Sequence, residues 1–285
     1  MANTVKMRDV HFDKKLFENY CTQTTLDEML CSYQGLPKGV NYMVIGDPGV
    51  GKTTVILDML ANIRQANPGV RVLFISAEMN EIDLAIYVNR YPKFADLDIL
   101  FIENDPTEES RSWRSIVETL EEGWDIVAID SFSELAGIIK EEELVSHHRA
   151  ETMLLSLIKQ HNKSQNNRCI NTSFLTIQQV TKKGAFVGTN RLKHMITAMM
   201  ELRLDNPKNS FSGRYITFSK HRRGDVGTKL YYSLMATGDV EYNSERYEQD
   251  QEVRRMQREV HQQLHDFADK FDQVFNAVNK SVYGE

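Results

Sequence analysis

A glycine-rich stretch at residues 46–54, GDPGVGKTT, carries the residue types needed to bind phosphate groups. It matches the pattern G-x-x-x-x-G-K-[ST], in which glycines let the backbone turn tightly so that successive N–H groups point at phosphate oxygens. The lysine of this pattern neutralises the β- and γ-phosphates, and the hydroxyl that follows it binds Mg²⁺. The stretch therefore predicts a nucleoside triphosphate site formed by Gly46, Asp47, Pro48, Gly49, Val50, Gly51, Lys52, Thr53 and Thr54.

A carboxylate at the end of a second apolar run completes the metal chemistry of such a site. Residues 125–130 read DIVAID and end in Asp130, about 75 residues after the glycine-rich stretch. A carboxylate in this position holds Mg²⁺ through water in phosphate-transferring enzymes. We therefore predict that Thr53 and Asp130 form the metal site.

Hydrolysis also needs a group that takes a proton from the attacking water. Ser131, not a glutamate, follows Asp130, so the base must come from elsewhere. Glu78, just past the apolar run in VLFISAEMN, is the main candidate, and Glu134 is the second. The alternative for Glu78 is a carboxylate that only stabilises the start of the helix predicted from residue 81.

Short β-rich runs alternate with helix-length segments along most of the chain, which predicts an α/β fold with a mostly parallel central sheet flanked by helices. The last three strands are separated by turn residues and predict an antiparallel edge. The predicted strands are 42–46, 70–76, 98–103, 125–130, 173–179, 199–204, 214–220 and 229–235, and the predicted helices are 53–65, 81–90, 108–121 and 148–163.

Composition restricts the class of protein. The 285 residues are 41% hydrophobic, yet no apolar stretch approaches the roughly 18 residues of a membrane span, and the N-terminus lacks a signal sequence. We expect a soluble, cytoplasmic protein without a membrane partner. The three cysteines form no CxxC pair, which argues against a disulfide framework or a cysteine zinc site.

The charge is concentrated in one segment. The formal net charge is −6, but residues 180–230 hold eleven Lys and Arg against three Asp and Glu, a net charge of +8 that leaves −14 for the rest. A basic segment within an acidic chain indicates a local site for a polyanion.

The pattern changes near residue 242. Apolar residues then recur at steps of three or four, which predicts an amphipathic helix of about ten turns. This helix either packs on the core or forms a coiled coil or docking arm for a protein partner. We divide the chain into a leader at 1–24, a core at 25–240 and a helical tail at 241–285.

Taken together, the motifs GDPGVGKTT, ISAEM, DIVAIDS and IQQVTK resemble the RecA-type ATPase core. The stretches QVTKKGAFVGTNRLKHM and KHRRG are similar to segments of the RadA (Sms) branch-migration ATPase family, to which DnaB-type replicative helicases are related. The resemblance covers residues 25–240 and implies ATP as the nucleotide and a RecA-like P-loop fold.

The resemblance also implies roles for individual residues. Glu78 matches the catalytic glutamate and Lys52 the P-loop lysine, while Gln179 falls where the family senses the γ-phosphate. Lys220 and Arg222 match cations that reach the ATP site of a neighbouring subunit, the alternative being an exposed basic hairpin. In the loop at 182–194, Lys182, Lys183, Arg191 and Lys193 match a contact with single-stranded DNA, the alternative being a basic loop that only aids solubility.

These features predict a homo-oligomeric, hexameric ATPase that depends on single-stranded DNA and acts in recombination, repair or replication, with possible helicase activity. Two alternatives stay open at this stage. One is a KaiC-like regulatory ATPase whose output is contact with another protein, and the other is a filament-forming strand-exchange recombinase.

Overall fold

A computed structural model of the chain describes residues 4–10, 17–102, 112–178, 193, 195–209 and 211–283. The chain divides into two compact units, Met1–Tyr242 and Asn243–Glu285. Among the described residues, no helix is long and apolar enough to cross a membrane.

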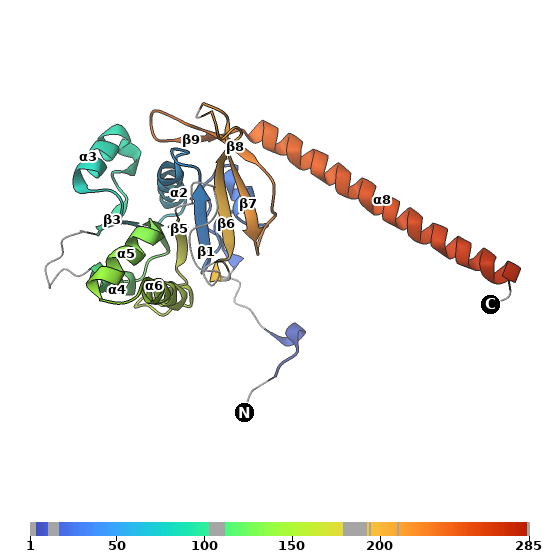
Figure 1. Cartoon of the computed structure of the whole chain (residues 1–285), viewed down its shortest axis with the longest axis horizontal. Helices are drawn as coiled ribbons and strands as arrows, with labels where there is room; N and C mark the ends of the chain where they lie inside the picture. Colours follow the sequence, from blue (N-terminus) through green and yellow to red (C-terminus); the bar gives the residue numbers. More distant parts are fainter. Residues whose placement is uncertain are drawn as a thin grey trace. The chain divides into compact units, whose positions relative to one another are not determined.

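The first unit is built on a single sheet, drawn in Figure 1, in which the described residues contribute nine strands. The strand order is β3-β2-β4-β5-β1-β6-β7-β8-β9. The pairs from β3 through β6 are parallel and the pairs from β6 through β9 are antiparallel. The bounds are β1 Asn41–Gly46, β2 Val72–Ser76, β3 Asp98–Phe101, β4 Ile126–Asp130, β5 Ser173–Ile177, β6 Ala198–Leu204, β7 Arg214–His221, β8 Leu230–Leu234 and β9 Val240–Tyr242.

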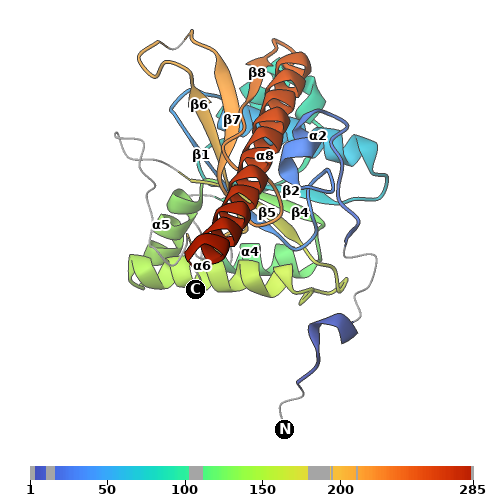
Figure 2. The same cartoon turned by 90° about the vertical axis from the view of Figure 1, so that its right-hand side faces the viewer.

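Helices cover both faces of this sheet. Met43 and Ile45 of β1 belong to a buried apolar cluster shared with α4, α5 and α6, which lie together in Figures 1 and 2. Because side chains alternate along a strand, Tyr42 and Val44 face the other side, where α2 packs. The described helices are η1 Met7–Asp9, α1 Leu26–Leu30, α2 Lys52–Ala66, α3 Glu81–Arg90, η3 Pro92–Phe94, α4 Ser112–Glu121, α5 Phe132–Glu142 and α6 His147–Asn162.

The predicted fold class is confirmed, with an antiparallel extension at the sheet edge that follows β6. Five elements went unpredicted, namely the short helices η1, α1 and η3, the helix α5 and the edge strand β9. The predicted strand at 98–103 ends earlier, at Phe101, and the predicted helix at 108–121 is described from Ser112 onward.

The parallel register brings distant residues to one edge of the sheet. β1 ends at Gly46, β2 at Ser76 and β4 at Asp130, with Ser76 directly opposite Asp130. The carboxyl ends of parallel strands are where α/β sheets bind ligands. The glycine-rich loop, Glu78 and Asp130 therefore all lie at this edge of the sheet.

The second unit holds the helix α8, Ser244–Tyr283, with 40 residues. The predicted C-terminal helix is therefore present. At 1.5 Å per residue it is about 60 Å long. On the helix taken by itself, the sequence repeats apolar residues at steps of three and four, for example at Val260, Leu264, Phe267 and Phe271.

Candidate nucleotide site

The glycine-rich loop joins β1 to α2, and the structure explains why two of its positions are glycine. A Cβ atom at Gly46 would lie 2.3 Å from the carbonyl oxygen of Leu202 on β6. Gly51 has a φ of +92°, and a Cβ there would lie 2.5 Å from a methyl group of Leu234. Since α2 begins at the next residue, Lys52, the N–H groups of its first turn are available to an anion.

The loop is fixed to the antiparallel side of the sheet by three polar contacts. The Asp47 carboxylate accepts a hydrogen bond from the backbone N–H of Leu204 at 3.1 Å and pairs with Arg203 at 3.2 Å. The Tyr232 hydroxyl donates to the carbonyl of Val50 at 2.8 Å. In the part of the chain that the structure describes, the Asp47 side chain thus holds the loop in place.

The Thr54 hydroxyl also bonds within the protein. It lies 2.6 Å from the hydroxyl of Tyr87 on α3, so it joins α2 to α3. Pro48 and Gly49 are exposed at the tip of the loop. Among the predicted nucleotide-binding residues, Lys52 and Thr53 have the side chains best placed for phosphate and metal.

The Lys52 ammonium lies against the loop itself. It donates hydrogen bonds to the carbonyls of Gly46 at 3.1 Å and Asp47 at 3.2 Å. Burial lowers the pKa of Lys52, while the nearby carboxylates of Asp130 and Glu78 act in the opposite direction. A phosphate group would give this ammonium a stronger partner than two neutral carbonyls, because hydrogen bonds between charged groups are about twice as strong.

Thr53 and Asp130, the predicted metal ligands, are in direct contact. The Thr53 hydroxyl donates to Asp130 at 2.5 Å, and Asp130 is only 3% exposed. Burial raises the pKa of Asp130 to about 6; the hydrogen bond from Thr53 opposes this rise, and Glu78 adds to it.

A divalent cation fits this pair of residues. A hydroxyl and a carboxylate are oxygen ligands of the kind that Mg²⁺ prefers, and a cation would compensate the negative charge of a buried carboxylate. Among the described residues, no group of three or more His, Cys, Asp or Glu could hold a metal. Mg²⁺ usually takes one or two protein ligands and completes its shell with phosphate and water, and Thr53 and Asp130 supply two such ligands.

Glu78 lies two residues past the end of β2 and is exposed. It is close enough to Asp130 and Lys52 to influence the pKa of both. The second candidate base, Glu134, is an exposed residue in the first turn of α5, directly after β4. The structure therefore brings Lys52, Asp130 and Glu78 together, as their places at one sheet edge require.

The raised pKa of Asp130 leads to a prediction about stability. With a pKa near 6 in the folded state and an ordinary value of 3.8, the folded protein binds more protons than the unfolded chain between these pH values. The contribution of Asp130 to the free energy of unfolding therefore falls as pH rises from about 4 to beyond about 6. In Asp130→Asn this loss is absent, and we expect the variant to be more stable at pH 8 by about 1–3 kcal/mol.

Urea unfolding of nucleotide-free protein in EDTA, at pH 4.5 and pH 8, measures this difference. The gain should be large at pH 8 and small at pH 4.5. Equal or lower stability of Asp130→Asn at pH 8 would contradict the raised pKa.

Lys220 and Arg222 lie toward the opposite end of the strands. Lys220 pairs with Met199 on β6, and Met199 pairs with Met43 on β1. Lys220 is therefore level with a residue three positions before Gly46, about 10 Å back along the strands and two strands to the side. Arg222 follows the end of β7 and is farther still from the loop, so neither cation reaches the phosphate-binding loop of its own chain.

The structure does place Lys220 against the end of the basic loop. Its ammonium donates a hydrogen bond to the carbonyl of Lys193, an exposed residue of that loop. The other predicted members of the site, Gln179, Lys182, Lys183 and Arg191, lie outside the described residues.

Sequence reasoning missed the polar network that supports the loop. Arg203 pairs with both Glu201 at 2.8 Å and Asp47 at 3.2 Å. Glu201 and Arg203 are two residues apart in a predicted strand, so the sequence alone could have predicted that they share one face of the sheet. Their link to Asp47, 156 positions away from Arg203, had no local signal.

Comparison with known proteins agrees with this geometry. A family model described as "AAA domain" matches residues 17–163. The DNA repair protein RadA of Campylobacter jejuni is 26% identical over 241 residues, which are 83% of this chain and 49% of that protein. RadA of Streptococcus pneumoniae is 26% identical over 212 residues, or 73% of this chain and 45% of that protein. The chain spans about half the length of these curated relatives.

Among solved structures, a KaiC-like protein from the archaeon Pyrococcus horikoshii has a TM-score of 0.57 at 18% identity, covering 77% of this chain and 95% of that one. At this identity the likeness concerns the fold. The predicted RecA-like P-loop ATPase fold and the relationship to RadA proteins are confirmed.

Proposed function

We propose, because the chain belongs to the AAA domain family and has a RecA-like P-loop fold, that it hydrolyses ATP in an oligomer and that single-stranded DNA stimulates the reaction. The RadA relatives favour a role in DNA repair or recombination. Whether the oligomer is a hexameric ring, and whether it unwinds strands, are finer parts of the same proposal.

One contact gives this proposal its main support. The hydrogen bond from Lys220 to the carbonyl of Lys193 joins β7, which carries Lys220 and is followed by Arg222, to the end of the basic loop. A strand of DNA that moves the loop would therefore move Lys220, and a nucleotide that draws Lys220 away would release the loop. In this proposal the contact couples the two functions.

The register supports action on a neighbouring copy. Lys220 is level with Met43, well behind Gly46 on the strands, so the ATP it serves must be bound by another chain. A head-to-tail arrangement of copies brings the β7 end of one chain to the glycine loop of the next, and such contacts close into rings or continue as filaments.

Each residue at the sheet edge then has a chemical task. Lys52 holds the β- and γ-phosphates, and Thr53 with Asp130 holds Mg²⁺, which neutralises phosphate charge when it is bound. Glu78 accepts a proton from the attacking water. Arg222, supplied by the neighbour, stabilises charge on the transferring phosphoryl group, and Gln179 remains the predicted γ-phosphate sensor.

The test is the ATPase rate with and without single-stranded DNA. We expect single-stranded DNA to raise the rate by about tenfold at 50 mM salt, and this stimulation to disappear as salt rises, because cations on a loop bind phosphates by counterion release. Duplex DNA and single-stranded RNA of the same length separate the possible polyanions. A Lys182→Ala/Lys183→Ala variant should retain the basal rate and lose the stimulation.

A rate that does not respond to any nucleic acid at either salt concentration would contradict the proposal. Lys52→Ala serves as the background control, since ATPase activity that remains in a preparation of this variant comes from a contaminating enzyme.

A regulatory ATPase that signals by protein contact is a second candidate, favoured by the 40-residue helix α8 with its apolar repeat. Deleting residues 243–285 separates the two. A DNA-stimulated ATPase keeps its stimulation after the deletion as long as it assembles, whereas a regulatory ATPase hydrolyses ATP without response to DNA and loses its bound partner.

A further inference from the structure

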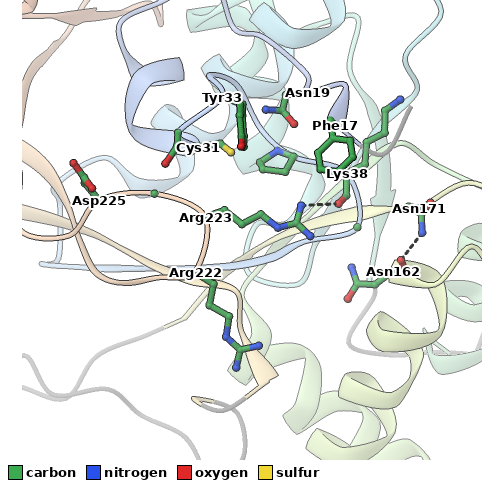
Figure 3. A pocket seen from close by; sticks show the side chains of 14 residues that line it. Phe17, Asn19, Cys31, Tyr33, Lys38, Asn162, Asn171, Arg222, Arg223 and Asp225 are labelled. Carbon is green, nitrogen blue, oxygen red and sulfur yellow. Dashed lines mark hydrogen bonds between the residues drawn. The ribbon is translucent and has the colours of Figure 1, made fainter. Parts of the chain in front are cut away.

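A second cavity lies away from the nucleotide site. It has a volume of about 860 Å³ and is drawn in Figure 3. Two exposed aromatic residues line it, Phe17 and Tyr33, at 59% and 78% exposure. Its charged lining residues are Lys38, Arg222, Arg223 and Asp225. The cavity therefore combines apolar surface with an excess of positive charge.

The cavity sits at the amino-terminal end of the parallel strands. Gly39 precedes β1 and Asn171 precedes β5, and both line it. In Figure 3 the Arg223 side chain extends to the carbonyl of Lys38, at 3.4 Å, while Arg222 points another way. Arg222, the proposed trans cation, thus lines this cavity, which lies at the end of the sheet opposite the glycine loop.

The helix α3 beside the nucleotide site has the complementary surface. It begins at Glu81, three residues after Glu78, and none of its residues is buried. Ile82 and Ile86 are one helical turn apart and are 71% and 62% exposed. Glu81 and Asp83 add negative charge to the first turn.

We propose that α3 of one copy docks into this cavity on the next copy, with Ile82 and Ile86 against Phe17 and Tyr33. The proposal rests on the proposed function, because Arg222 can reach a neighbour's ATP only if the two surfaces come together. Arg222 lines the cavity, and Glu78 marks the ATP that it must reach. In the assembly, the cavity that Arg222 lines must therefore face the surface around Glu78 on the neighbouring copy, and α3 is part of that surface.

Charge and polarity favour this pairing. Glu81 and Asp83 of the helix meet a cavity wall that has three cations and one carboxylate. Two isoleucines at a spacing of four form the apolar anchor of a helix laid in a groove. The contact also links assembly to chemistry, since Tyr87 of the same helix bonds to Thr54 directly after the metal-binding Thr53.

Cross-linking between copies tests the geometry. In a background with Cys21, Cys31 and Cys169 replaced by serine, which removes Cys31 from the wall of the same cavity, we introduce Tyr33→Cys and Ile86→Cys together. Mild oxidation in the presence of a non-hydrolysable ATP analogue should give a ladder of covalent oligomers on a non-reducing gel. Each single variant should stop at dimers or remain monomeric. Absence of the ladder from a protein that assembles and keeps DNA-stimulated hydrolysis would overturn the docking while leaving the proposed function intact.

A charge substitution tests the energetics. Ile86→Asp should weaken assembly at least tenfold by sedimentation while a fluorescent ATP analogue still binds. Leu144→Asp is the matched control, because Leu144 is an equally apolar side chain that is 91% exposed on another part of the surface. Normal assembly of Ile86→Asp would overturn the proposal. So would a Tyr33→Ala variant that assembles normally but binds single-stranded DNA more weakly, because the cavity would then be a nucleic-acid site.

Discussion

Replacement of Lys52 by alanine is expected to lower the rate of ATP hydrolysis by a factor of about 10²–10³, the usual cost of removing one preorganised donor from developing charge. The Lys52 ammonium is the cation that the structure places inside the glycine loop, 3.1 Å from the carbonyl of Gly46 and 3.2 Å from that of Asp47. With the side chain removed, phosphate oxygens in the loop keep backbone N–H donors and lose the positive charge of Lys52. Steady-state phosphate release measures the effect.

The matched control is Lys140→Ala, which removes an exposed lysine at the end of α5, away from the sheet edge. It should hydrolyse ATP at the native rate. Thermal unfolding of both variants shows whether loss of the loop contacts of Lys52 has unfolded the protein. A folded Lys52→Ala protein with more than half of the native rate would show that the phosphates bind elsewhere.

The sequence was most informative where the chemistry is local in the chain. The glycine loop needs a strand before it, a helix after it and a fixed spacing between them, so nine consecutive residues were enough to predict β1, the loop and α2. Asp130 was predictable for a similar reason, as it is the last residue of a fully buried strand. The meeting of these segments then followed from the parallel order of the sheet.

Contacts between distant segments could not be predicted in this way. Asp47 fitted the motif, but its carboxylate is held by Arg203 and by the backbone of Leu204. Thr54 bonds to Tyr87, 33 residues away. Nothing in a local pattern shows which of several polar residues a side chain will find, because this depends on strand order and register.

The helix α5, which lies beside the site, was not predicted, and this also has a physical reason. α5 spans Phe132–Glu142, with Ser133 in its first turn, Gly137 at its centre and Glu141 and Glu142 in its last turn, where negative charge opposes the helix dipole. Its helical propensity is therefore modest, and its stability comes from Phe132, Leu135 and Ile139, which are buried in the core. Tertiary packing of this kind is invisible to propensity alone.

Register excludes one role for the cations of KHRRG. KHRRG could be either an exposed basic hairpin or a trans finger. The pairing of Lys220 with Met199, and of Met199 with Met43, removes a role for Lys220 at its own nucleotide. A trans finger and an exposed basic hairpin both remain compatible with this register, and the next prediction distinguishes them.

Arg222→Ala is expected to lower the ATPase rate of the assembled protein by about 10³, within the range for arginine fingers. The affinity of each chain for ATP should stay close to native, because Arg222 follows the end of β7, far from its own glycine loop. Arg114→Ala is a matched control for loss of positive charge, since the Arg114 guanidinium is exposed on α4 and pairs with Glu118 of the same helix. That variant should lose far less activity.

Mixing two inactive variants identifies the chain that supplies the cation. A copy with Arg222→Ala keeps its own Lys52, and a copy with Lys52→Ala keeps its own Arg222. If the cation acts on the neighbour, a site is intact where the nucleotide-binding side of an Arg222→Ala copy meets the Arg222 of a Lys52→Ala copy. In a head-to-tail ring assembled from an equimolar mixture, this occurs at about a quarter of all interfaces. Activity should then return to about a quarter of native, from two proteins that are each nearly inactive. If Arg222 served its own chain, no interface in the mixture would hold both groups and no activity would return, because every glycine loop with a lysine would lack its arginine.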